Sequence, residues 1–263
     1  MKRSKWYTSL PWIVLLLGDL GMGLRRWLYA AALDDRGLLP VLHPLEACLW
    51  LLTAATLVLI LLTVWKLDGD GAYENNFSPS PVAAAGQAAA AAGILVTVRG
   101  NVPVLPGLPS TVLPGLLSGL WKALGFLSFL CLLGAAYCRL KVKKPFFLLH
   151  AVPSLFFVLH IVNHYRLWNS KPQLMSYVFT LFGTAAMALF ALYTAFFEAE
   201  LPRRRMQLGM GLAAVYLCAV SLSDMFYPWL YLGAIAWAVT GLCTLEPKPL
   251  PPKPGKTGEE PEP

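Results

Sequence analysis

Charged residues are scarce in this sequence. Of its 263 residues only 13% are Asp, Glu, Lys or Arg, whereas 57% are hydrophobic, and the mean hydropathy is +0.59. Soluble domains carry about 25% charged residues. A soluble fold of this length could not hide so much apolar surface beneath so few polar side chains. The sequence therefore predicts an all-α, polytopic transmembrane helical bundle whose main partner is the lipid bilayer.

The signature motifs of several enzyme classes are also absent. The sequence has no G-x-x-x-x-G-K-[ST] phosphate loop, no G-x-G-x-x-G, no H-E-x-x-H and no G-x-S-x-G. Its five cysteines form no C-x-x-C pair, which favours packing residues over disulfides or metal ligands. The longest predicted loops, about 15 residues, leave no room for a separate catalytic domain. We expect no ATP hydrolysis by this chain itself.

Apolar segments fill most of the chain. A helix of about 20 apolar residues crosses a bilayer, and about eight segments approach that length. The first contains Asp19, Arg25 and Arg26, which favours a retained helix over a cleaved signal peptide. We predict a transmembrane domain over 1–245 and a disordered, Pro-rich, charged cytoplasmic tail over 246–263. The predicted spans are 8–33, 44–65, 81–98, 113–137, 146–165, 174–197, 208–226 and 229–245.

The distribution of basic residues indicates the orientation, because short cytoplasmic loops collect Lys and Arg. With the N- and C-termini cytoplasmic and eight crossings, fourteen of the 21 basic residues face the cytoplasm. The net charge of +7 therefore reflects topology, and we expect no nucleic-acid partner. The expected location is the plasma membrane. The fourteen are Lys2, Arg3, Lys5, Lys66, Arg139, Lys141, Lys143, Lys144, Arg203, Arg204, Arg205, Lys248, Lys253 and Lys256.

The third segment, 81–98, is rich in alanine and only weakly hydrophobic. If it did not cross the membrane, the basic clusters at 139–144 and 203–205 would both face outside. The charge bias therefore favours a crossing. Small residues allow neighbouring helices to approach closely, so we expect this helix within the bundle.

Ionisable residues at membrane depth are the main indicators of function. Each costs roughly 2.5–3.5 kcal/mol on the mildest insertion scale, so such residues are usually retained for a reason. A rise of about 1.5 Å per residue places groups from four predicted helices in one layer near the outer face. We predict that they line an outward-facing polar cavity. The candidates are Arg25, Arg26, Glu46, His160, His164 and Asp224.

His160 and His164 are four residues apart and share one helical face. With Glu46 or Asp224 they could hold a metal ion, or the cavity could take a small anion or polar substrate. The structural alternative is that these residues bind water and lipid headgroups, with Arg25 or Arg26 extending to the interface. The sequence decides neither the metal nor any other cofactor.

A second candidate is an intramembrane charge pair of Asp19 and Lys122. Both lie within predicted spans, and we place them at comparable depths. Opposite charges in hydrocarbon are expected to meet directly or through water. Such a pair could lock the bundle or lie on a proton route.

Three functions fit these observations. We favour a protein that binds or transports a small polar ligand or ion, driven by an ion gradient or a partner. The alternatives are an intramembrane enzyme acting on a lipid-linked substrate, with a histidine as base, and a non-catalytic membrane subunit or sensor. The sequence has no convincing internal repeat, so it gives no sign of an inverted-repeat transporter.

The topology makes a direct prediction. Reporter tags fused to residue 1 and to residue 263 should both report the cytoplasmic side, because eight spans return the chain to its starting face. Tags that report opposite sides of the membrane would contradict the even number of crossings.

Overall fold

The computed structural model describes residues 6–32, 43–66, 76–77, 79–100, 115–141, 143–169, 177–224 and 227–245, with the side chains of 6–8, 115–116 and 165–169 excepted. The predicted disordered tail, 246–263, lies outside the described residues.

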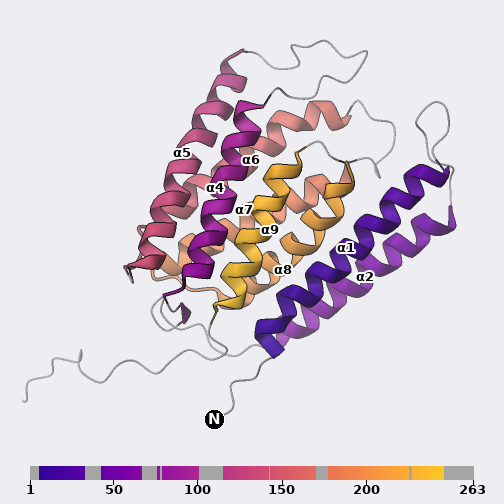
Figure 1. The fold of residues 1–263 in the computed structure, drawn as a ribbon, viewed down its shortest axis with the longest axis horizontal. Coiled ribbons are helices and arrows are strands. Elements are labelled where there is room, and N and C mark those ends of the chain that lie inside the picture. The colour runs from indigo at the N-terminus through magenta and orange to yellow at the C-terminus, as the bar shows by residue number, and fades with distance from the viewer. Residues whose placement is uncertain are drawn as a thin grey trace, which may run out of the picture.

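The described chain is all-helical, as predicted, with eight α-helices and no strand (Figure 1). Its one bridge-type backbone pairing, between Phe77 and Leu245, belongs to no sheet. The helices are α1 (Trp6–Ala32), α2 (Pro44–Trp65), α4 (Pro81–Arg99), α5 (Gly115–Leu140), α6 (Leu148–Asn169), α7 (Val178–Glu198), α8 (Arg204–Ser221) and α9 (Pro228–Cys243), with a 3-10 turn, η2 (Leu222–Asp224), after α8.

Five of the described helices are long and apolar enough to cross a membrane. They are α2, α4, α5, α7 and the α8–η2 unit, while the apolar parts of α6 and α9 are shorter. Large apolar side chains also cover the outside of the bundle: Leu51 is 74% exposed and Leu61 67%. Contiguous apolar surface of this kind is typical of a lipid-facing protein. The count of eight spans and the sides of the two termini stay predictions.

The last six helices form a closed ring. Each helix from α4 to α9 packs against the next one in the chain, and α9 returns to pack against α4. The helices α1 and α2 form an antiparallel pair beside this ring, on the side of α8 and away from α5 (Figure 1). The ring therefore encloses an interior, and the α1–α2 pair covers part of its outer wall.

Glycine residues allow α4 and α9 to approach each other closely. A Cβ built on Gly93 would lie 2.3 Å from the Trp229 carbonyl oxygen, and one on Gly233 would lie 2.9 Å from that of Ala89. The helix backbones touch at these points, which is the packing that small residues permit in membranes. The expectation that the Ala-rich helix lies within the bundle is confirmed.

The same backbone contact gives a stability prediction. Gly93→Ala should destabilise the protein by about 1–3 kcal/mol, because the added methyl group forces two backbones apart. Thermal unfolding in detergent micelles measures the loss. The matched control is Gly119→Ala on α5, where a Cβ meets no atom within 4 Å. Equal melting temperatures for the two variants would contradict the close packing of α4 on α9.

Candidate functional site

Arg25 of α1 and Asp224 of η2, two of the predicted cavity residues, meet inside the protein. The Arg25 Nη1 and Asp224 Oδ2 atoms are 2.9 Å apart, and the two side chains are 0% and 5% exposed. Residue counting placed both in one layer, and the 3-10 turn after α8 brings the carboxylate to α1. The contact ties the α1–α2 pair to the ring.

Aromatic rings complete the surroundings of the Arg25 guanidinium group. Its Nη2 donates a hydrogen bond of 2.9 Å to the Tyr29 hydroxyl oxygen, one turn further along α1. Its Cζ lies 5.1 Å from the centre of the Phe179 ring on α7. A cation over an aromatic face gains further stabilisation when water is excluded. The ion pair is therefore electrically balanced and closely packed.

The two predicted histidines lie together on α6. Their ring centres are 4.1 Å apart, and both side chains are buried. His164 Nδ1 is 2.7 Å from the His160 carbonyl oxygen, so it carries a proton and donates to that oxygen. His164 Nε2 forms a hydrogen bond with the Tyr227 hydroxyl group. Both ring nitrogens of His164 therefore have partners.

His160 is enclosed but lacks such partners. It is 0% exposed, and neither of its ring nitrogens has a hydrogen-bond partner among the described residues. Aromatic rings of Trp121, Phe156 and Tyr227 surround it, with centres 5.0–6.1 Å away. Two further buried atoms here, Asn163 Oδ1 and Trp121 Nε1, have no described partner either. We call His160, His164, Asn163, Trp121 and Tyr227 the His160 cluster.

Unpaired polar atoms in a dry interior are energetically costly, at roughly 1–3 kcal/mol each. Water or a ligand that reached this cluster would complete the hydrogen bonds of these four atoms. The cluster includes Tyr227, Trp121 and Asn163, which the sequence analysis did not select. Their signal in the sequence was only their spacing: Asn163 lies between the two histidines, and Tyr227 comes three residues after Asp224.

Two predicted cavity residues lie apart from this arrangement. Arg26 is exposed, because it follows Arg25 and points to a different face of α1. Glu46 is half-buried in the first turn of α2, where an acid favours the helix dipole. The preceding His43 caps the same helix by accepting a 3.2 Å hydrogen bond from the Leu45 backbone N–H. Among the described residues, no three His, Cys, Asp or Glu side chains are grouped as metal ligands.

The structure does not bring Asp19 and Lys122 together. Asp19 is exposed on α1 and Lys122 is exposed on α5, which lie on opposite sides of the molecule (Figure 1). No described ion pair joins them. Equal depth in the membrane was deduced from residue counting, but the direction each side chain takes around its helix was not.

A second polar cluster, missed by the sequence analysis as a site, lies where α5 meets α6 and α7 meets α8. We call this the basic end of the bundle, because Arg139, Lys144 and Arg203 occur there. His150 Nδ1 lies 2.6 Å from Glu198 Oε1, and both side chains are enclosed, at 1% and 0% exposed.

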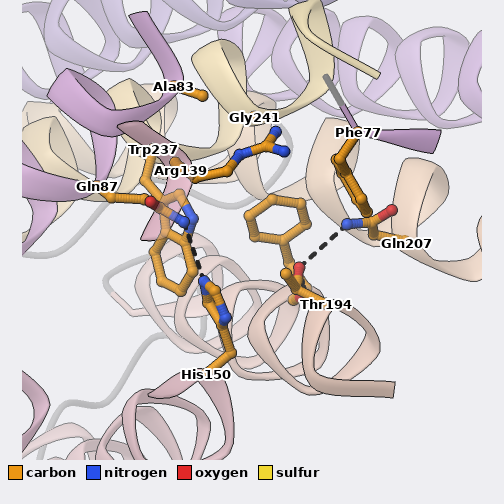
Figure 2. A pocket seen from close by; sticks show the side chains of 10 residues that line it. Phe77, Ala83, Gln87, Arg139, His150, Thr194, Gln207, Trp237 and Gly241 are labelled. Atoms are coloured by element: carbon orange, nitrogen blue, oxygen red, sulfur yellow. Dashed lines mark hydrogen bonds between the residues drawn. The ribbon is translucent and has the colours of Figure 1, made fainter. Parts of the chain in front are cut away.

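A small cavity adjoins this pair (Figure 2). Its volume of about 20 Å³ is enough to hold one or two water molecules. Figure 2 shows Gln87, Trp237 and His150 on one side of it, Phe77, Thr194 and Gln207 on the other, and the Arg139 guanidinium group between them. The remaining lining residues are Ala83, Phe190 and Gly241.

The polar residues of this cavity are largely paired with each other. Gln87 Nε2 is 3.0 Å from His150 Nε2, and Gln207 Nε2 donates a 3.1 Å hydrogen bond to Thr194 Oγ1. Arg139 donates to Thr244 Oγ1 at 3.1 Å, and its Cζ lies 4.6 Å from the Phe77 ring centre. One feature of the sequence could have indicated this polar cavity: Gln87 is a lone amide in an alanine-rich helix.

No family model, no curated protein and no solved structure matches the chain. Function is therefore inferred from the site itself.

The buried ion pair makes a prediction of its own. Asp224→Ala should destabilise the protein by about 3–5 kcal/mol, because the Arg25 charge then stays buried without its counter-ion. The double variant Arg25→Met, Asp224→Leu should recover most of that loss, since neither charge is then buried. Thermal unfolding in micelles compares them, with Arg26→Met as an exposed control. A double variant no more stable than Asp224→Ala would contradict this account.

Proposed function

We propose that the chain is a multi-pass membrane protein that binds and transports a small polar solute or ion through the interior of the α4–α9 ring. The observation that carries the proposal is the His160 imidazole, which is fully buried with neither ring nitrogen hydrogen-bonded to a described group. Polar atoms at membrane depth are retained where they serve a pathway or a ligand.

The chemistry of the unpaired atoms restricts the solute. A neutral imidazole offers one donor and one acceptor, Trp121 Nε1 is a donor, and Asn163 Oδ1 is an acceptor. A ligand must therefore both donate and accept hydrogen bonds. The neighbouring charges of Arg25 and Asp224 already balance each other. These features favour a small uncharged polar solute, or an ion that enters with water.

The spacing along α6 supports a path rather than a single surface site. His150 and His160 are ten residues apart, about 15 Å along the helix axis. Between them lie the buried rings of Phe156 and Phe157. Two polar layers separated by an apolar layer match a closed path that must open by movement of the helices. Energy would come from an ion gradient or a partner, because the sequence carries no ATP-binding motif.

The orientation and location also belong to the proposal. The basic end of the bundle would face the cytoplasm, as the bias of Lys and Arg requires. The His160 cluster would then lie toward the outer face of the plasma membrane. A solute from outside would meet it first.

A membrane subunit or sensor is the second candidate, favoured by the exposed Asp19 carboxyl group on α1. A carboxyl group that faces lipid is costly, and a helix of a partner protein would shield it. The lipid-acting enzyme receives less support. Its base would be His160, which is 0% exposed and therefore closed to a lipid substrate.

Accessibility to thiol reagents tests transport. In a variant whose five native cysteines are replaced, Asn163→Cys should react with a membrane-impermeant maleimide added to intact cells, because a transport path opens to the outside from time to time. The reaction should be slow, since the closed side chain is only 3% exposed.

The control is native Cys218 of α8, kept as the single cysteine in an otherwise identical background. It is 0% exposed and packs in the apolar core. It should not react in the same time. Equal, negligible labelling of both positions would contradict a path that opens and would favour the subunit.

A further inference from the structure

We propose that His150 and Glu198, with the adjoining cavity, form a proton-binding site at the basic end of the bundle. The proton is the ligand, and the site is separate from the His160 cluster. The inference does not depend on transport, because it concerns a protonation equilibrium that exists in either function.

The fold fixes Glu198 firmly. Glu198 is the last residue of α7. Beyond it, the Leu201 N–H donates a 2.9 Å hydrogen bond to the Phe196 carbonyl oxygen, which closes the helix end. The intervening Glu200 has a φ of 64°, a left-handed conformation in which glycine is the usual residue. Its exposed carboxylate lies 2.7 Å from Lys144 Nζ at the surface, a kind of ion pair that contributes little to stability.

The hydrogen bonds of His150 define where a proton binds. In a neutral ring, Nδ1 carries the hydrogen and donates to Glu198 Oε1, while Nε2 accepts from the Gln87 amide. While the carboxylate stays ionised, a proton added to the ring binds to Nε2. The resulting imidazolium stands beside a buried carboxylate, which stabilises the positive charge.

Gln87 supplies the acceptor that the protonated ring requires. Its Oε1 atom is buried and has no hydrogen-bond partner in the described structure. A half-turn of the amide brings Oε1 toward Nε2 in place of the NH₂ group, so both states of the ring have a partner. Each amide orientation thus corresponds to one charge state of His150.

Water can complete the remaining bonds. The cavity has room for one or two molecules, and its lining includes Gln87 and Gln207, whose Oε1 atoms have no described hydrogen-bond partner. Glu198 Oε2, also buried and without a described hydrogen-bond partner, is a third acceptor beside His150. Bound water would both satisfy these oxygens and deliver the proton.

Other charged and titratable groups lie on the neighbouring elements, among them Lys143, whose charge acts on Cys138. From α5, Arg139 lines the cavity and Cys138 lies close enough to Glu198 to interact electrostatically. From α8, buried Arg204 lies one turn before Gln207. The described cavity lining from α4, α7 and α9 is uncharged. Arg139 opposes an additional positive charge, so the Glu198 carboxylate is essential for proton binding.

Nuclear magnetic resonance of histidine labelled with ¹⁵N tests the site, because the nitrogen shifts report which ring atom carries hydrogen. The chain has four histidines, so single variants assign each signal. The His150 signal should disappear in His150→Gln. At high pH it should show hydrogen on Nδ1 alone, and on acidification it should change reversibly to the doubly protonated ring.

Glu198→Gln should weaken the proton affinity of His150 by about tenfold or more, because the charge of the carboxylate is lost while its shape is kept. Glu200→Gln is the matched control: Lys144 lowers the pKa of this exposed carboxyl group by hydrogen bonding, and the group does not touch His150. It should leave the His150 midpoint unchanged. If Glu198→Gln does not fold, Gln87→Leu provides a second variant, which should also weaken proton binding.

Two results would overturn the proposal. The first is a His150 ring that stays neutral throughout the pH range in which the protein is folded. The second is a midpoint that is the same in the wild type, Glu198→Gln and Gln87→Leu. If His150→Gln does not fold, assignment proceeds by elimination with variants of His43, His160 and His164. A failure of thiol labelling at Asn163, by contrast, leaves this titration unaffected.

Discussion

The structure depends on the fact that hydrocarbon offers no hydrogen bonds. Every polar group within the bundle must find a partner in the protein, in trapped water or in a ligand. Short side chains meet this requirement locally: Thr53, Thr97 and Thr184 each donate to a backbone carbonyl oxygen four residues earlier. Arg25 meets it at long range through Asp224. The exceptions, above all His160, therefore carry the most information about function.

Helix positions could be predicted from the sequence because length and hydropathy are local properties. The predicted span 44–65 coincides with α2. The weakly hydrophobic segment 81–98, which the surrounding charges predicted as a span, lies within α4. The order of helices in the ring could not be predicted. The contact of Gly93 with the Trp229 backbone depends on matching two surfaces, and many helices carry small residues.

Residue counting gave expected depths for the candidate site but no side-chain directions. Counting residues placed Arg25, Asp224, His160 and His164 in one layer, because the rise per residue is fixed. It could not separate Arg25 from Arg26, which differ only in rotation about the helix axis. The same uncertainty explains Asp19, whose side chain is exposed. Gln87, His150 and Glu198 were missed as a group because each has an adequate local explanation.

The two clusters on α6 differ in how their histidines are held, and this difference bears on mechanism. His150 is held by hydrogen-bond partners from α4 and α7. Any change at its ring therefore alters its contacts with both of these helices. His160 has no described hydrogen bond through its ring and is held by packing alone. Packing is easily rearranged when a ligand supplies the missing bonds, whereas breaking buried hydrogen bonds leaves polar groups unpaired at a cost. On the proposed function, opening of the ring would therefore begin at the His160 cluster, and the basic end would stay closed until the charge of the His150–Glu198 pair changes.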